Sequence, residues 1–486
     1  MPASHDELFR LTATEAVSLL KRGDITPLDL IDAAELRIAE VEPAINALPT
    51  LCLDRAREHA RRLARGEGRE AEGEPGWLGG LPVAIKDLAD VAGVRTTYGS
   101  PIFKDHVPKT SHPVVERIER KGGVVIAKSN TPEFGAGGST FNEVFGRTRN
   151  PWNTALTSGG STGGGAAALA AGEIWLAHGS DHAGSLRRPA TYCSVVGLRP
   201  SAGRVTRGTS NNLFAPLSVQ GPMARTVADV ALFLDTMAGL CSRDPLTFEA
   251  PRRSFTEAVA SPVVPKRVAF TATFGGKVLV DRETREICAK AVRRFENLGA
   301  VVEEAAPDLG GIGEAFLVLR SQHYVVDREL LLKTHRHLIK PDIIWNTERG
   351  LTQTPSELAA AERERAALFR RTAEFFETYD LLVSPGGLHA CVRCQSAHAC
   401  RDRRPEARSL SRRLIDYGSD DHDGPAFHCG PVWLRPVRPP GRFADRRSPS
   451  RRSRIASGRC IVRAGDGSRP QRASQSATGH CTQRSE

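Results

Sequence analysis

Two serines and one lysine are the residues of this 486-residue chain whose types and surroundings best fit a chemical role. Ser161 lies in the glycine-rich run 159–165, and Ser185 ends a second such run, 179–185. Lys86 closes an apolar segment upstream of both. Glycine lets the backbone approach a ligand closely and take positive φ, so such loops can point N–H groups at an anion. A serine held there becomes a nucleophile when a base removes its proton, which is how acyl transfer is catalysed.

Two other interpretations of the run 159–165 fit less well. The pattern G-x-S-x-G is also the nucleophile elbow of α/β-hydrolases, but that elbow needs an apolar strand before it, and residues 150–158 predict a poor strand. A phosphate-binding loop would end in Gly-Lys-Ser/Thr, which this run lacks. On its own, the run is also compatible with a structural turn.

Alternating strand and helix patterns supply the elements that must position these residues. Predicted strands are 81–85, 124–127, 174–177, 268–270, 300–302 and 381–384, and predicted helices are 14–20, 26–38, 53–63, 113–121, 165–171, 230–237, 284–298 and 356–376. Pro27 after Thr26 marks a helix start, and Thr226 is an expected N-cap with Asp229 in the capping-box position. The alternation predicts an α/β fold with a mixed, twisted sheet covered by helices on both faces.

The last hundred residues differ in composition from the rest. Residues 386–486 contain 20 arginines, no lysine and 9 acidic residues, a net charge of +11 that equals that of the whole chain. Residues 1–385 are therefore neutral overall, and the charge gives no evidence that they bind nucleic acid. Stretches such as 446–454 also have too few apolar residues to offset the entropy of ordering the chain.

Three explanations of residues 386–486 compete: a nucleic-acid-binding arm, a disordered tail, and a reading-frame error in a GC-rich gene. We favour the frame error, because Arg, Pro, Ser and Cys rise together while Lys disappears. Cys391 and Cys394 with His398 and Cys400 suggest a zinc site, but the second ligand pair of a usual finger is missing, so we interpret this group as accidental.

Cysteine spacing and the lack of long apolar segments indicate where in the cell the protein is expected. Cys52, Cys193, Cys241 and Cys288 are too scattered for a disulfide framework, so we expect buried thiols of an intracellular protein. No signal-peptide pattern and no apolar run long enough to span a membrane is found. We therefore expect a cytoplasmic protein.

Motifs around the three chemical residues resemble the amidase signature family of Ser–Ser–Lys amide hydrolases. The family's pattern G-G-S-S-G-G-S corresponds to Gly159–Gly165, its pattern G-T-D-x-G-G-S-[IL]-R-x-P-A to Gly179–Ala190, and its lysine motif G-[VL]-P-V-A-I-K-D to Gly80–Asp87. Further matching phrases are 145–152, 195–200, 203–205, 221–226 and 243–246. The resemblance extends from about residue 5 to residue 385.

This resemblance implies the amidase-signature fold and assigns a role to each chemical residue. Ser185 would be the nucleophile that attacks the amide carbonyl and forms an acyl-enzyme. Ser161, in a cis-serine conformation, would relay a proton, and Lys86 would be the base. A lysine acts as a base only without its proton, so burial must lower its pKa from about 10.4.

The resemblance also implies residues that bind the substrate and the oxyanion. They are Gly135, His182, Ala183, Gly184 and Ser185, with the backbone N–H groups of 182–185 forming the oxyanion hole. Ala183 stands where the family has glycine. We interpret this change as adjusting the backbone of the oxyanion hole without loss of activity. Asp181 and Arg187 are expected to brace the loop through charge-assisted hydrogen bonds. The mechanism needs none of the nearby histidines.

Three regions follow: residues 1–78 as the N-terminal helical part of the fold, 79–385 as the catalytic core, and 386–486 as the aberrant tail. The family normally continues with a helix, a proline–glycine segment and a closing G-L-Q-[IL]-[VI]-G strand. None of these is recognisable in 386–486. The C-terminal strands of the fold are thus expected to be missing or replaced.

The leading interpretation is an amidase that hydrolyses a small carboxamide to a carboxylate and an amine or ammonia. The alternatives are a glutamyl-tRNA amidotransferase component of the A type, an inactive frameshifted remnant, and a nucleic-acid binder acting through the arginine-rich tail. No metal ion or organic cofactor is expected. The expected partner is a small-molecule amide, without nucleic acid or membrane, and homodimer formation is left open.

Overall fold

The computed structural model describes residues 5–208, 211–387 and 433–434. The predicted tail, 386–486, therefore lies almost wholly outside the described residues, and so do its cysteines and the suggested zinc ligands.

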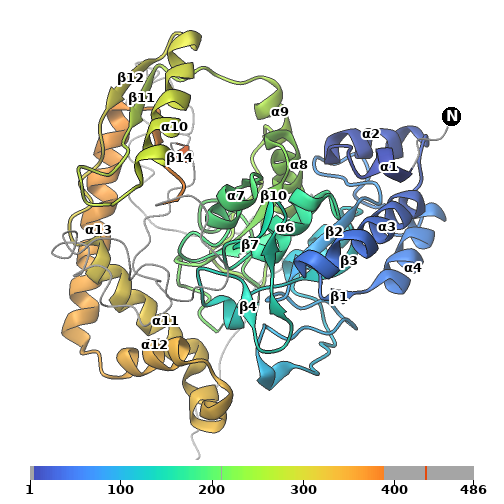
Figure 1. Cartoon of the computed structure of the whole chain (residues 1–486), viewed down its shortest axis with the longest axis horizontal. Helices are drawn as coiled ribbons and strands as arrows, with labels where there is room; N and C mark the ends of the chain where they lie inside the picture. The colour runs from blue at the N-terminus through green and yellow to red at the C-terminus, as the bar shows by residue number, and fades with distance from the viewer. Residues whose placement is uncertain (1–4, 209–210, 388–432, 435–486) are drawn as a thin grey trace, which may run out of the picture. The chain divides into compact units, whose positions relative to one another are not determined.

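A six-stranded mixed sheet forms the centre of the fold, with strand order β1-β3-β2-β8-β10-β9 (Figure 1). Its strands are β1 (Thr50–Leu51), β2 (Pro82–Lys86), β3 (Val124–Ser129), β8 (Leu176–Asp181), β9 (Val196–Gly197) and β10 (Val219–Ala224). Strand β2 is parallel to both of its neighbours, β3 and β8, whereas β1, β9 and β10 pair in antiparallel fashion. The predicted mixed sheet is confirmed.

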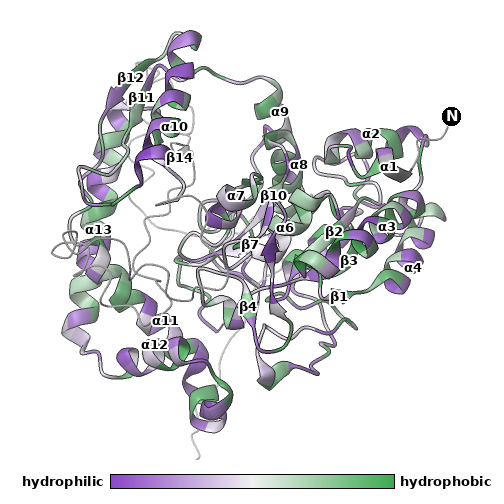
Figure 2. Cartoon of the chain, viewed as in Figure 1, coloured by the Kyte–Doolittle hydropathy of each residue, from purple (hydrophilic) through white to green (hydrophobic). Residues whose placement is uncertain are grey.

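Strands β2 and β3 are central because their sequences can be buried on both faces. Every residue of both strands is buried, including the two lysines Lys86 and Lys128. Parallel strands covered on both faces read as continuous apolar runs, which is how these segments appear in the sequence and in Figure 2. The lysines are exceptions, and each needs polar partners inside the protein.

Helices cover both faces of this sheet. On one face lies α6 (Gly163–Ala171), where a Cβ on Gly165 would lie 3.1 Å from the Cβ of Ala177 in β8. On the other lie α5 (Pro113–Arg120) and α8 (Val227–Met237), which contact each other and strands β3 and β10. The predicted α/β architecture is confirmed.

The N-terminal helices begin where their capping residues predict. They are α1 (His5–Leu8), α2 (Ala13–Arg22), α3 (Pro27–Ile45) and α4 (Leu53–Ala64). Thr12 and Thr26 each form a capping box with the acidic residue three positions later, and Pro27 occupies the first turn of α3. Thr226 likewise caps α8 by accepting from the Asp229 N–H at 3.1 Å. The Asp229 carboxylate, however, does not return to the cap: it accepts from the N–H and hydroxyl of Thr14, and so links α8 to α2.

Three predicted strands, 268–270, 300–302 and 381–384, belong to a second sheet and not to the central one. This sheet has the order β12-β11-β13-β14, with β11 (Arg267–Phe270), β12 (Val301–Glu304), β13 (Leu381–Val383) and β14 (Trp433–Leu434). Parallel pairing of β11 with β12 and β13 buries Val268, Val292 and Ala300 in a separate small core. The strand pattern alone did not separate the sheets, because register and partner choice depend on tertiary packing.

The remaining elements are helices and short strands around the two sheets. They are α7 (Arg187–Cys193), α9 (Phe255–Ala260), α10 (Arg282–Val292), α11 (Ile312–His335), α12 (Pro341–Leu351) and α13 (Pro355–Thr378), the hairpins β4 (Phe141–Asn142) with β5 (Gly146–Arg147) and β6 (Arg149–Asn150) with β7 (Asn153–Thr157), and the 3-10 turns η1 (Pro101–Phe103), η2 (Glu133–Gly135), η3 (Arg293–Leu298) and η4 (Arg336–Leu338). Helix α11 packs against both α12 and α13.

The described cysteines are free thiols, as predicted, but only Cys193 is buried. Cys52, Cys241 and Cys288 are half-buried, so the expectation of uniformly buried thiols was wrong. Among the described helices, none is both long and apolar enough to cross a membrane.

Candidate active site

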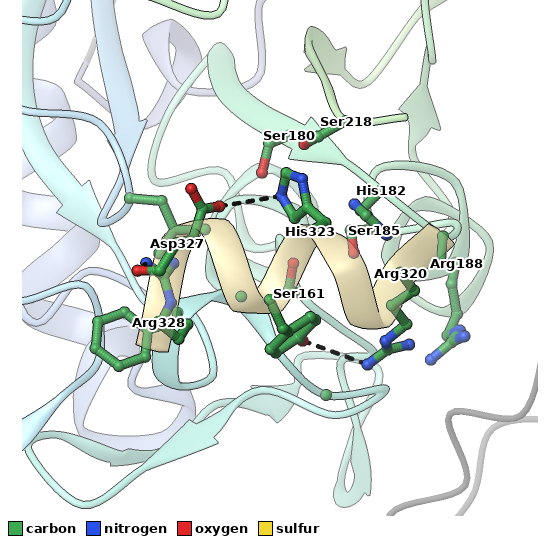
Figure 3. A pocket seen from close by; sticks show the side chains of 16 residues that line it. Ser161, Ser180, His182, Ser185, Arg188, Ser218, Arg320, His323, Asp327 and Arg328 are labelled. Carbon is green, nitrogen blue, oxygen red and sulfur yellow. Dashed lines mark hydrogen bonds and ion pairs between the residues drawn. The ribbon is translucent and has the colours of Figure 1, made fainter. Parts of the chain in front are cut away.

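A pocket of about 110 Å³ brings the predicted residues together at the carboxyl ends of β2 and β8 (Figure 3). Ser161, His182, Ala183, Ser185 and Gly135 all line it. Lys86 and Gly184 lie directly behind this lining, hydrogen-bonded to Ser161 and to Asp181 respectively. The chain thus gathers residues from four separate sequence segments into one site.

Lys86 ends β2 and is completely buried beneath the pocket. Its Nζ lies 2.7 Å from Ser161 Oγ and 3.0 Å from both Thr162 Oγ1 and Ser180 Oγ. Burial lowers the pKa of Lys86 to about 7, while the nearby charge of Asp181 acts in the opposite direction. A large fraction of this amine is therefore without its proton at neutral pH.

Thr162 and Ser180 were not expected to contact the lysine. They differ from the family pattern and lie outside the three motif positions that carry its triad. Their hydroxyls nonetheless complete the environment of the buried amine. Sequence spacing did not reveal this, because the contacts join strand β8 and the start of α6 to the end of β2.

Ser161 lies just before α6, and its peptide bond with Gly160 is cis, the conformation that the family resemblance implies. The predicted Gly135 is next to it, because a Cβ on Gly135 would lie 3.5 Å from Ser161 Oγ. A strand, β7, does precede this loop, contrary to the expectation from residues 150–158. It pairs only with β6, in a hairpin outside the central sheet, so the nucleophile-elbow arrangement is still absent.

Asp181 fixes the loop that carries Ser185. Its buried carboxylate accepts from Nε and Nη2 of Arg187 and from Nη1 of Arg199, each at 3.0 Å. It also accepts from the N–H groups of Gly184 and Leu186, on either side of Ser185. Burial by itself would raise the pKa of Asp181, but the two arginines and these N–H donors hold it well below its usual range. The predicted bracing by Asp181 and Arg187 is confirmed.

One of the N–H groups predicted to form the oxyanion hole, that of Gly184, is already engaged: it donates to Asp181 Oδ1 at 2.9 Å. The N–H of Gly135, which also lines the pocket, donates to the Pro132 carbonyl at 2.8 Å. Among the described residues, the N–H groups of His182, Ala183 and Ser185 have no acceptor. These three are therefore available to a developing oxyanion, and Gly184, with φ at +101°, shapes the loop that carries them.

The Ser185 hydroxyl also has no hydrogen-bond partner within the described parts of the chain. Figure 3 shows it and the Ser161 hydroxyl between helix α11 and the loop of His182. A hydroxyl that lines a pocket without a protein partner is available to a ligand.

Helix α11 forms a pocket wall that sequence reasoning missed. Arg320, His323, Tyr324, Asp327 and Arg328 follow helical spacing and all line the pocket. The stripe of polar residues at i, i+3, i+4, i+7 and i+8 was the available signal, since such a stripe marks one face of a helix. Only the fold could show that this face meets Ser185.

The histidine at the predicted position 182 contacts this wall. Its ring lies 5.0 Å from that of His323 and 5.9 Å from that of Phe316. Burial lowers the pKa of His182 well below its ordinary value, and the neighbouring His323 and Arg320 act in the same direction. His182 is therefore a neutral imidazole at the pocket and not a charged group.

Known proteins similar to this chain are amide-acting proteins, in line with the site described above. Residues 29–412 match the model of the Amidase family. The match passes residue 385, where we expected the resemblance to end, and stops within the arginine-rich segment. An acylamidase of Rhodococcus erythropolis is 35% identical over 424 residues, covering 85% of this chain and 86% of that protein. The A-type component of the glutamyl-tRNA(Gln) amidotransferase of Synechococcus sp. (strain CC9605) is 38% identical over 305 residues, or 62% of each chain.

Solved structures show the same fold. A bacterial aryl acylamidase of the amidase signature family aligns with a TM-score of 0.72 at 30% identity, covering 79% of this chain and 81% of that one. A 6-aminohexanoate cyclic dimer hydrolase aligns with a TM-score of 0.73 at 26% identity, covering 83% and 85%. This chain therefore belongs to the amidase family and is a hydrolase that acts on amide C–N bonds.

Proposed function

We propose that the chain hydrolyses acyl amides through an acyl-enzyme, with Ser185 as nucleophile, Ser161 as proton relay and Lys86 as base. The observation that carries this proposal is the 2.7 Å contact between the buried Lys86 amine and Ser161 Oγ, beside the unpartnered Ser185 hydroxyl. In the structure the Lys86 amine donates to the hydroxyls of Ser161, Thr162 and Ser180. A neutral amine has two N–H donors and one lone pair, and for the proton transfer we assign the lone pair to Ser161.

In the first half-reaction, Ser185 Oγ attacks the amide carbon while its proton passes to Ser161 Oγ and the Ser161 proton passes to Lys86 Nζ. The carbonyl oxygen becomes an oxyanion that accepts from the N–H groups of Ala183 and Ser185. The C–N bond then breaks as the proton returns along the same path to the amine. In the second half, water attacks the Ser185 ester while one of its protons passes through Ser161 to Lys86. The C–O bond then breaks, that proton returns along the same path to Ser185 Oγ, and the carboxylic acid leaves.

The comparisons favour an acylamidase over an amidotransferase component. The acylamidase relative is matched over 86% of its length, whereas the chain spans only 62% of the amidotransferase component. The proposed substrate is accordingly a free acyl amide, and no second protein is required. A glutaminase activity that appears only with a partner protein present would favour the amidotransferase alternative.

A fluorophosphonate probe tests the role of each serine. We expect covalent labelling of Ser185, located by peptide mass spectrometry, and strongly reduced labelling in Lys86→Ala because the base is lost. Labelling at Ser161 would reverse the two serine roles. Hydrolysis of acyl anilides and aliphatic amides by the same preparation would establish the activity itself.

A further inference from the structure

One guanidinium that lines the pocket, that of Arg328, has no carboxylate partner within the described residues. Its Nη1 donates to the carbonyl oxygen of Asp327 at 2.9 Å, and its Cζ lies 4.3 Å from the ring centroid of Phe134. The neighbouring Glu133 carboxylate is occupied by Ser100 Oγ and the Lys340 N–H. Because a guanidinium has five N–H donors, most of those of Arg328 remain for a ligand.

The described pocket lining contains more guanidinium groups than carboxylates. Arg188 and Arg320 also line the pocket, and the acid that lines it, Asp327, lies 3.1 Å from His323 Nε2. Burial lowers the pKa of His323 despite Asp327, so this imidazole adds no charge at neutral pH. Arg188 and Arg320 make further interactions of their own, and Arg328 is the lining guanidinium on which the inference rests.

Resting on the proposed function, we infer that the substrate is an amide that carries a carboxylate, and that Arg328 is the specificity-determining residue that binds it. The planar fork of a guanidinium matches a carboxylate in a bidentate pair, and the Phe134 ring beneath it holds that plane in place. Leu88 and Tyr324 supply apolar surface for the carbon chain between the two groups.

The carboxylate could belong to the acyl part or to the amine part of the substrate, and two substrate pairs separate these cases. The monoamide of butanedioic acid is compared with butanamide, and N-butanoylglycine with N-propylbutanamide. We expect the anionic member of at least one pair to have a kcat/KM about 10- to 100-fold higher, mainly through a lower KM. Arg328→Gln should reduce that ratio to near one, and Arg328→Lys should give an intermediate ratio because it keeps the charge but loses the fork.

Lys333→Gln is the matched control, since Lys333 lies on the same helix in an exposed pair with Glu329 and away from the pocket. This variant should keep the selectivity ratio of the unaltered chain. Equal kcat/KM values within both pairs, or ratios that Arg328→Gln leaves unchanged, would overturn the inference. Circular dichroism of each variant checks that the fold is retained.

A binding measurement separates failure of this inference from failure of the proposed function. Titration calorimetry with butanedioate, on Ser185→Ala and on Ser185→Ala/Arg328→Gln, does not depend on turnover. We expect butanedioate to bind the first protein and to bind the second at least about 10-fold more weakly. Equal binding to both would reject the role of Arg328 even if the chain is an active amidase, whereas a difference would support it even if no amide is hydrolysed.

Discussion

At the scale of single residues, two lysines of the described chain, Lys86 and Lys128, are completely buried in very different surroundings. Lys128 lies 3.2 Å from the Asp87 carboxylate and donates to the Ala89 carbonyl and to Thr96 Oγ1. Lys86 has only hydroxyl partners, at 2.7 and 3.0 Å. A paired ammonium keeps its proton more readily than one surrounded by neutral groups, because the carboxylate stabilises the charged form. The contrast explains why Lys86, and not Lys128, is suited to act as a base.

Substitution of each triad member should remove most of the activity. Ser185→Ala should lower kcat by about 10⁴- to 10⁶-fold because the attacking atom is gone, with little change in stability since a small half-buried hydroxyl is lost. Ser161→Ala and Lys86→Ala should each cost several orders of magnitude. The double variant Lys86→Ala/Ser161→Ala should be little worse than either single one, because the residues act as one unit. Losses that multiply would show that they act independently.

The activity should rise with pH as Lys86 loses its proton. Because the neutral amine is the base, kcat/KM should increase about tenfold per pH unit well below 7 and level off above it, following the pKa of about 7. A pH–rate profile with a neutral amide substrate measures this limb. Asp181→Asn should shift the limb to lower pH, since the negative charge that favours the protonated lysine is removed. A flat profile between pH 5 and about 9 would exclude Lys86 as the base.

At the scale of elements, helix α6 places Ser161 because it can approach the sheet very closely. Its sequence consists of glycine and alanine with one leucine, and nearly all of its residues are buried. A Cβ on Gly164 would lie 2.4 Å from the Asn130 N and 2.6 Å from the Ala47 carbonyl oxygen, both backbone atoms. Small residues are therefore required here by packing, against the weak helix propensity of glycine.

Gly164→Ala should consequently destabilise the protein, although alanine is the better helix former. We expect a loss of about 1–3 kcal/mol from overpacking against backbone that has little room to move, together with reduced activity as α6 shifts Ser161. Gly165→Ala is the matched control, since its nearest contact would be the Ala177 Cβ at 3.1 Å. It should be close to neutral, because the gain in helix propensity of about 1 kcal/mol offsets the tighter contact. Chemical denaturation of both variants measures the difference, and equal stabilities would contradict this account.

At the scale of the whole molecule, the second sheet ends close to the point where composition changes. Within the described residues, strand β13 pairs with β11 on one side and with Trp433 and Leu434 of β14 on the other. Lysine disappears and arginine accumulates after residue 385, and the family match stops at residue 412. A sheet edge that lacks its partner strand favours association between chains.

We therefore predict that shifting the reading frame near codon 386 restores an apolar, strand-forming sequence with a proline–glycine segment and a closing G-L-Q-like strand. The DNA sequence read in all three frames tests the first part. The frame-restored protein should be more soluble and hydrolyse amides faster than the 486-residue chain, as sedimentation and amide hydrolysis would show. Equal activity of the two forms would reject the frame error and would call for a functional role of the arginine-rich segment.

Much of this site could be predicted from sequence because the chemistry depends on local loops. The glycine runs carry the backbone conformations that place Ser161, Asp181 and Ser185, and those runs are contiguous in the chain. The strand and helix patterns likewise followed from local apolar periodicity and capping residues. The start of α3 at Thr26 and Pro27 illustrates this, since its capping signal lies within four residues.

Which residues face these loops across the pocket depends on the tertiary structure and not on the local sequence. The hydroxyl contacts of Lys86 and the guanidinium of Arg328 at the pocket join segments far apart in the sequence, whose contact depends on packing. The separation of β11, β12 and β13 from the central sheet has the same origin, since a strand's sequence determines that it pairs but not with which partner. Short-range patterns thus determined the catalytic groups, and long-range packing determined the proton environment and the substrate-facing wall.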